Sequence, residues 1–83
     1  MNTLFALLAK HGDINIPLEK CCAEYFGVDI KKANERACLQ DLPVPTYKLG
    51  GKRSPWFVSA EKLAEYIDRK KREAQQDWER VRA

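Results

Sequence analysis

The apolar positions along the chain change their spacing several times, and each change marks the start of another predicted element. Leu4, Leu7 and Leu8 have the spacing of one helix face, so residues 3–10 predict a first short helix. Residues 13–16 then alternate polar and apolar side chains, as a brief strand does. The opening of the chain therefore predicts a helix followed by a strand.

Two further helices are predicted in the next stretch, and a glycine separates them. Residues 18–26 again have helical apolar spacing. Gly27 follows at a position where a left-handed residue commonly ends a helix, and Asp29 is a candidate N-cap for a third helix over residues 30–40. Two short helices joined by a tight glycine turn predict a helix-turn-helix.

The third predicted helix has a small-residue face and a charged face. Small or apolar residues at helical spacing form the inner face, namely Ile30, Ala33 and Ala37. Charged residues form the outer face, namely Lys31, Lys32, Glu35 and Arg36. An ordinary solvated surface helix has the same pattern, so this helix alone leaves open whether its charges meet water or a charged partner.

Residues 42–58 predict a basic β-hairpin, in which two β-prone runs flank a glycine-rich turn. Gly50 and Gly51 allow positive φ at little steric cost, so we expect the chain to reverse there and to present Lys52 and Arg53 at the tip. The prolines before the first run cannot continue a helix, and they set an extended path into the hairpin. We expect the earlier brief strand to pair with this hairpin in a three-stranded antiparallel sheet.

The last third of the chain predicts one long helix. Its first turns carry an apolar stripe that can cover the sheet, and the stripe thins beyond Asp68. Residues 69–83 are therefore expected to project as an extension of the domain formed by residues 1–68. We interpret Trp78 and Val81, on this extension, as a contact with a second protomer or with another protein such as RNA polymerase. A Trp78 that folds back on the domain, or lies exposed near the chain end, is the alternative.

Length and charge narrow the functional classes. A chain of 83 residues predicts one domain, which is short for an enzyme with a separate substrate cleft. The formal net charge is +3, and residues 31–53 alone have a balance of +4. The excess of positive charge is therefore concentrated on the third predicted helix and the hairpin.

The residue patterns that support catalysis or metal binding are not found in the sequence. The three cysteines are odd in number and the single histidine, His11, lies in a different segment, so neither a disulfide framework nor a zinc site is expected. There is no glycine-rich phosphate loop, no paired histidine and carboxylate, and no cysteine with a nearby histidine. We expect no catalytic residue, no metal and no cofactor. No apolar run approaches the about 20 residues of a membrane span, and we expect a soluble protein of a reducing cytoplasm.

A helix-turn-helix followed by a basic hairpin predicts a winged helix-turn-helix, an α+β fold, here with a long C-terminal helix. In that fold residues 30–40 would enter the major groove of double-stranded DNA, and residues 48–56 would lie on the backbone or in the minor groove. The residues expected to read or flank bases are Lys31, Lys32, Glu35 and Arg36. The residues expected to hold the backbone are Lys48, Lys52 and Arg53. We expect more than one protomer on repeated or palindromic sites.

Several short motifs, taken in their order and spacing, resemble the pyocin activator protein (PrtN) family. They are MNTLF at residues 1–5, IPL at 16–18, YFG at 25–27, LPVPT at 42–46, and SPW at 54–56 followed by Val58. No single motif is specific, but the series extends to about Asp68. The resemblance implies a small transcription activator, bacterial or associated with a prophage. It would act on the nucleoid and switch on bacteriocin or phage-tail-like genes through sites upstream of them.

Two other functions stay open. The predicted fold is more distantly similar to phage excisionases and to small regulators with MerR-like winged domains, which implies an accessory role in recombination as one alternative. A protein-binding adaptor or antirepressor that acts through the C-terminal helix is the other. DNA binding would depend on Lys52, Arg53 and Arg36, whereas an adaptor would depend chiefly on Trp78 and Val81.

Overall fold

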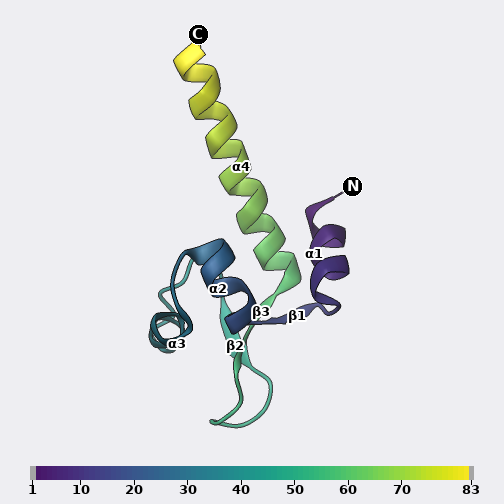
Figure 1. Cartoon of the computed structure of the whole chain (residues 1–83), viewed down its shortest axis with the longest axis vertical. Coiled ribbons are helices and arrows are strands. Elements are labelled where there is room, and N and C mark those ends of the chain that lie inside the picture. The colour runs from purple at the N-terminus through teal and green to yellow at the C-terminus, as the bar shows by residue number, and fades with distance from the viewer. Residues whose placement is uncertain (1, 83) are drawn as a thin grey trace.

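The structure, a computed structural model, describes residues 2–82, which fold into four helices and three short strands (Figure 1). In chain order the elements are α1 (Thr3–His11), β1 (Asn15–Pro17), α2 (Leu18–Phe26), α3 (Ile30–Cys38), β2 (Thr46–Lys48), β3 (Trp56–Ser59) and α4 (Ala60–Arg82). The predicted α+β class, with a small antiparallel sheet and a long last helix, is confirmed. Met1 and Ala83, the outer ends of the predicted ranges 1–68 and 69–83, lie outside the described residues.

The three strands form one antiparallel sheet, as the sequence predicted, and β3 lies in its middle. Val58 of β3 pairs with Ile16 of β1 on one side and with Thr46 of β2 on the other. Ile16 and Val58 are fully buried, because α2 packs against β1 and β3 and α4 packs against β3. This row of side chains therefore belongs to the core of the molecule.

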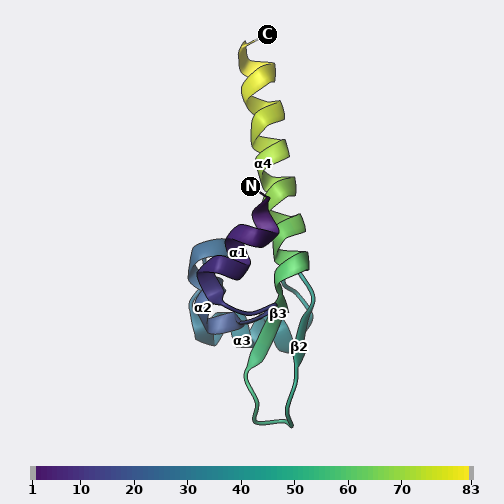
Figure 2. The same ribbon diagram turned by 90° about the vertical axis from the view of Figure 1, so that its right-hand side faces the viewer.

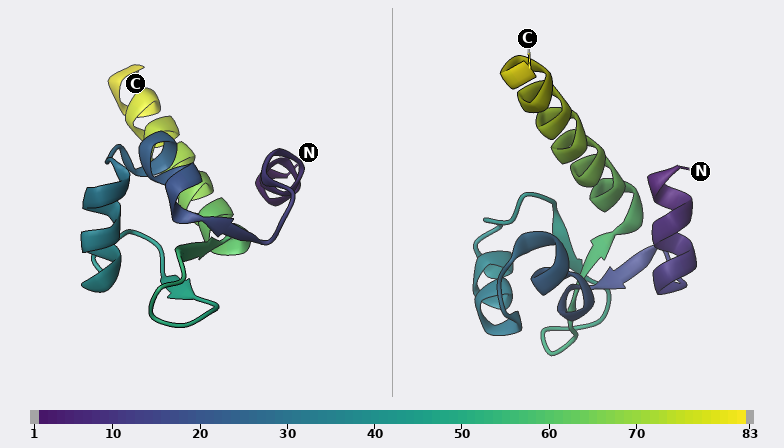
Figure 3. Two further views of the ribbon diagram at one scale, coloured as in Figure 1. Left: turned by 60° about the horizontal axis from the view of Figure 1, so that its bottom comes forward. Right: turned by 45° about the horizontal axis from the view of Figure 1, so that its top comes forward.

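The helices lie around this sheet at different places. α3 and α1 lie on opposite sides of the sheet region, with α2 between them (Figures 1 and 3). α1 packs against the first half of α4, where Leu7 is buried (Figure 2). The Thr3 hydroxyl donates a hydrogen bond of 2.5 Å to Oδ1 of Asp68 and so ties the two helices together. Beyond Asp68 every described residue of α4 is exposed, and the helix continues away from the core without a break.

The turn between α2 and α3 follows the sequence prediction. Gly27 ends α2 in the left-handed conformation, with a φ of 69°. The N–H groups of Gly27 and Val28 both donate to the carbonyl of Cys22, which satisfies a carbonyl at the end of the helix. Asp29 caps α3, because its side chain accepts a hydrogen bond of 2.8 Å from the N–H of Lys32. The two helices are therefore set at a fixed angle by backbone geometry.

α3 begins at Ile30 as predicted, but it differs from its prediction in the exposure of that residue and in where the helix ends. Ala33 and Ala37 are fully buried as expected, but Ile30 is 41% exposed and is not part of the inner face. The helix ends at Cys38 and not at residue 40, because Gln40 has a φ of 53° and turns the chain away. The N–H of Asp41 then donates to the carbonyl of Arg36 at 2.8 Å, which closes the end of the helix.

His11 lies at the end of α1 in a partly buried position. Its ring meets the ring of Tyr25 edge-on, with centroids 6.4 Å apart. Its Nε2 atom is buried and has no hydrogen-bond partner within residues 2–82. Burial lowers the pKa of His11 below its ordinary value of 6.5, and the nearby Lys10 and Lys20 lower it further while Glu24 opposes them. The folded protein therefore favours the neutral form of this side chain.

We expect Gly27→Ala to lower the free energy of unfolding by about 1 to 2 kcal/mol, because an L-residue is strained in the left-handed conformation. A Cβ at Gly27 would have no atom within 4 Å, so the loss would come from backbone strain and not from a clash. Urea denaturation followed by circular dichroism measures the change. Gly51→Ala is the matched control, since a Cβ there also has no atom within 4 Å and φ is not left-handed. Equal effects of the two substitutions would contradict this account.

The stability of the fold should depend on pH through His11. As pH falls below 6.5, the unfolded chain takes up a proton at His11 before the folded chain does, so the unfolded state binds more protons. The free energy of unfolding should therefore be fully retained above about pH 6.5 and should decline as pH falls from there toward the lower folded pKa. Urea denaturation at a series of pH values from neutral down to mildly acidic would measure the decline. His11→Gln should flatten the profile, and an unchanged profile in that variant would rule out His11 as the source.

Candidate nucleic-acid interface

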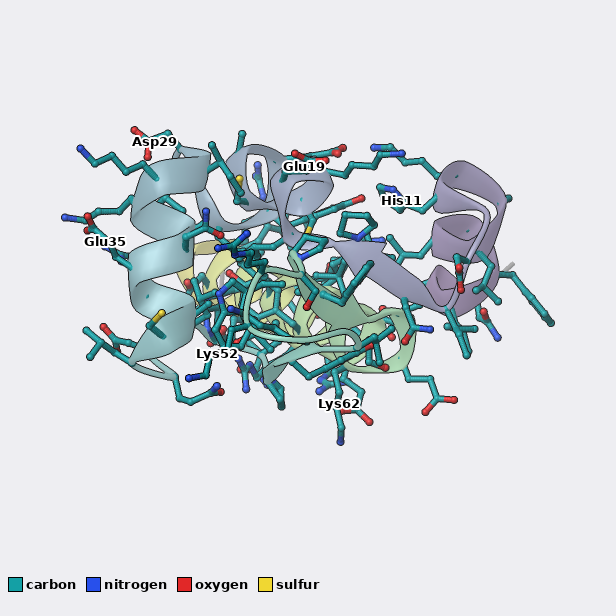
Figure 4. All side chains as sticks on the ribbon, turned by 90° about the horizontal axis from the view of Figure 1, so that it is seen from below. His11, Glu19, Asp29, Glu35, Lys52 and Lys62 are labelled. Atoms are coloured by element: carbon teal, nitrogen blue, oxygen red, sulfur yellow. The ribbon has the colours of Figure 1, made fainter. Side chains whose placement is uncertain are left out.

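α3 presents most of its predicted site residues to solvent. Lys31, Lys32 and Glu35 are exposed, and Glu35 points away from the rest of the molecule (Figure 4). Arg36 differs from them, because it lies half-buried in the last turn of the helix. The single charged face predicted from the sequence is therefore divided into a free outer face and a partly covered flank.

The loop between β2 and β3, which we call the wing tip (residues 49–55), carries Lys52 and Arg53. Both side chains are exposed, and neither forms an ion pair within residues 2–82. The turn is closed by Ser54, whose N–H and hydroxyl both donate to the carbonyl of Gly51, at 3.0 and 2.9 Å. Two cations without protein partners therefore lie at the end of a closed turn.

The glycines of the wing tip serve a different purpose from the one predicted. Neither Gly50 nor Gly51 has a φ in the left-handed region, so the expectation of positive φ was wrong. Gly50 instead lies close to Ser54, because a Cβ at Gly50 would be 3.1 Å from the Ser54 Cβ. A side chain at position 50 would therefore make a tight contact, and Ser54 would have to shift by a few tenths of an ångström.

Lys48 braces the hairpin formed by β2, β3 and the loop between them, which we call the wing. Its ammonium lies 4.9 Å from the centre of the Trp56 ring and donates a hydrogen bond of 2.7 Å to the carbonyl of Lys52. A cation over an indole ring is attracted by the ring's negative face, so this side chain joins the strand to the loop. Trp56 in turn packs against the hydrophobic core. The wing is therefore stiffened between its base and its tip.

A groove separates α3 from the wing. Its helical wall includes Glu19, Ile30 and Asn34, and its wing wall includes Lys48, Arg53 and Trp56. The predicted residues Lys31, Lys32, Glu35, Arg36 and Lys52 do not line this groove. The structure therefore brings Lys48 and Arg53 opposite α3, and it brings two unpredicted residues of α3 opposite the wing.

The sequence analysis missed Ile30 and Asn34 as candidate site residues. They lie four positions apart and share one flank of α3, whereas Arg36 falls on the opposite flank. Asn34 is exposed, and its side-chain amide makes no hydrogen bond within the described chain. Their helical spacing was visible in the sequence, but the wing's position beside that flank was not.

The far end of α4 is a separate surface. Trp78 is 54% exposed and Val81 is 85% exposed, and the Arg82 guanidinium lies 4.7 Å from the centre of the Trp78 ring. Trp78 therefore does not fold back on the domain. The end of α4 and the wing tip lie at opposite ends of the molecule, whose longest dimension is 52 Å (Figures 1 and 2).

Other kinds of site are not seen in the described part of the chain. Within residues 2–82, no three His, Cys, Asp or Glu side chains are gathered as ligands for a metal ion. No helix in the same range has both the length and the apolar character needed to cross a bilayer.

Comparison with protein families gives a match to the model described as pyocin activator protein PrtN, over residues 3–74. Searches of curated proteins and of solved structures found no match. The matched range runs from α1 into the second half of α4 and passes beyond Asp68, where the resemblance seen in the sequence ended. It includes α3 and the wing, and it leaves Trp78 and Val81 outside. Because the match covers most of the chain, the protein belongs to the PrtN family of pyocin activator proteins.

Proposed function

We propose that this protein is a sequence-specific DNA-binding activator of transcription for bacteriocin or prophage-type genes and acts on the bacterial nucleoid. In this proposal α2 and α3 form a helix-turn-helix, and β2 and β3 form its wing. Membership of the pyocin activator family supports transcription activation. The order of a glycine-linked helix pair followed by a hairpin supports the winged helix-turn-helix.

The observation that carries the proposal is the position of the unpaired cations. Lys31 and Lys32 are exposed on α3, and Lys52 and Arg53 are exposed at the wing tip; of these four residues, Arg53 lines the groove between the two elements. Lysine and arginine bind DNA chiefly through the phosphates, and such contacts fix the position and register of a protein on the duplex. Two groups of cations on separate elements are suited to the two sides of a DNA groove.

The dimensions of α3 suit the major groove. An α-helix with its side chains is about 10–12 Å in diameter, and the nine residues of α3 give it a length of about 13.5 Å. The major groove of B-DNA is about 12 Å wide and admits an α-helix. With α3 in that groove, the wing would reach the adjacent backbone or minor groove, and the brace between Lys48 and Trp56 would limit how far its tip bends.

We also propose that the far end of α4 is a protein-binding surface. Exposed tryptophan is unusual on a charged helix, and tryptophan is enriched at the energetic centres of protein interfaces. Our preferred partner is a second protomer, which would place two α3 helices on repeated or palindromic sites; RNA polymerase is the alternative. An adaptor or antirepressor without DNA binding would use this same surface, so experiments on DNA must decide between the two functions.

The test of DNA binding is a fluorescence-anisotropy titration with the DNA upstream of the protein's own gene and with a scrambled duplex. We expect a preference for the upstream DNA that persists as salt rises. Replacing Lys52 and Arg53 together by glutamine should weaken binding to both duplexes. It should also reduce the slope of log affinity against log salt by about 2, at roughly 0.9 per phosphate contact.

The matched control for the wing variant replaces Lys71 and Arg72 by glutamine, which removes the same charge about halfway along α4. These residues lie roughly 17 Å along α4 from its first residue. At physiological salt, interactions between exposed charges are largely screened beyond about 8 Å. The control should therefore leave the salt slope nearly unchanged. An equal loss in both variants would reduce the interface to general basicity, and no binding to either duplex would favour the adaptor.

Trp78→Ala should weaken self-association while leaving the fold intact, because Trp78 is exposed and contributes to no buried cluster. Sedimentation analysis over a range of concentrations should show a shift toward the monomer, and Val81→Ala should shift it in the same direction. Leu39→Ala is the control, since Leu39 is also a large exposed residue, 77% accessible, but lies outside α4. If the Trp78 and Leu39 variants associate like the unmodified protein, the second protomer is excluded as the partner of this surface.

A further inference from the structure

We infer that Asn34 and Ile30, and not Arg36, read the bases: Asn34 contacts an adenine, and Ile30 contacts the methyl group of a nearby thymine. This inference rests on the proposed function, because it concerns how the same interface chooses its sequence. It moves base reading to the flank of α3 that lies beside the wing. The cations on α3 and on the wing then hold phosphates.

The first step is the direction from which DNA approaches α3. The wing tip carries unpaired cations, and it lies beside the flank of α3 that bears Ile30 and Asn34. A rigid duplex gripped by the wing therefore meets α3 on that flank. Arg36 is half-buried on the opposite flank, so it lies farther from a duplex held in this way.

The second step is the chemistry of the two side chains. Asn34 is exposed, and its amide makes no hydrogen bond within residues 2–82, so both its donor and its acceptor are free. An asparagine amide can bond N6 and N7 of adenine at the same time, which distinguishes adenine from the other bases. Ile30 is 41% exposed although it is a large aliphatic residue, and an apolar side chain in the major groove recognises the thymine methyl group.

The third step is the carboxylate in the groove. Glu19, from α2, lines the groove together with Ile30 and Asn34, and its negative charge would repel a phosphate placed there. Base edges carry no such charge, and the amino groups of adenine and cytosine are donors that a carboxylate tolerates. The interior of the groove therefore suits base edges, while the phosphates suit the wing tip.

The spacing of the two residues also fits a duplex. Four residues of helix span about 6 Å along the axis. Base pairs are stacked about 3.4 Å apart, so Ile30 and Asn34 can contact bases no more than about two steps apart. N-terminal residues of a recognition helix are those that commonly reach base edges; Ile30 is the first residue of α3 and Asn34 is its middle residue, whereas Arg36 lies in its last turn.

The first experiment is a selection of bound duplexes from a pool with a randomised central segment. It uses the whole protein and its Asn34→Ala, Ile30→Ala and Arg36→Ala variants. The unmodified protein should enrich a motif that contains adenine and, within two base pairs, thymine. Asn34→Ala should lose about 5- to 150-fold discrimination at the adenine position while keeping the other positions and the salt slope. Arg36→Ala should enrich the same motif as the unmodified protein.

Chemical changes in the enriched duplex test the contacts without altering the fold of the protein. Replacing the adenine by 7-deazaadenine removes N7, and replacing the thymine by deoxyuridine removes only the methyl group. The unmodified protein should lose affinity for each altered duplex, Asn34→Ala should be insensitive to the first, and Ile30→Ala to the second. A motif that is unchanged in Asn34→Ala but loses one position in Arg36→Ala would overturn the inference and leave the proposed function standing. Binding without any enriched motif would overturn both.

Discussion

The pairing of β3 with strands on both of its sides fixes the position of the wing. A hairpin with strands as short as β2 and β3 is marginal in water on its own, so it needs a third strand and a helix to hold it. β1 supplies the third strand, and the row Ile16, Val58 and Thr46 is buried under the helices. β3 leads directly into α4, where the N–H of Ala60 donates to the carbonyl of Ile14 at 2.8 Å. The wing, the helix pair and α4 are thereby joined through four residues of one strand.

The same arrangement separates the two surfaces that the proposals use. α3 and the wing tip lie at one end of the molecule, and the end of α4 lies at the other. The exposed half of α4 is supported by contacts within the helix, such as the Lys70–Glu73 ion pair and the hydrogen bond from Gln75 to Glu79. Pairs of this kind contribute only about 0.2 to 0.5 kcal/mol each, so packing against a partner would add considerably to the order of this half.

Much of the fold could be predicted from the sequence, because its signals are local. Gly27 and Asp29 mark the turn between α2 and α3 by backbone conformation and capping, and both act as expected. The site was harder to predict, because it depends on which flank of a helix meets a distant hairpin. Ile30 was assigned to the core from its apolar character, yet it lies at the first turn, where the inner face is not fully covered. Asn34 carries no charge, so the sequence alone did not mark it as a site residue. Only the position of the wing beside it shows that it lines the groove.

The small number of free cations at the proposed DNA interface makes the affinity for DNA depend on the other end of the molecule. The cations free for phosphates are few, and Lys48 is partly engaged by Trp56 and by the carbonyl of Lys52. Since affinity for DNA backbone grows with the number of phosphates neutralised, one protomer with so few contacts would bind weakly at physiological salt. Joining two protomers through α4 would make the second binding event intramolecular, and its high effective concentration would raise affinity without any new contact to DNA. A second protomer would also double the number of bases read. On the proposed function, the far end of α4 therefore governs both affinity and selectivity for DNA, although it lies away from the DNA interface.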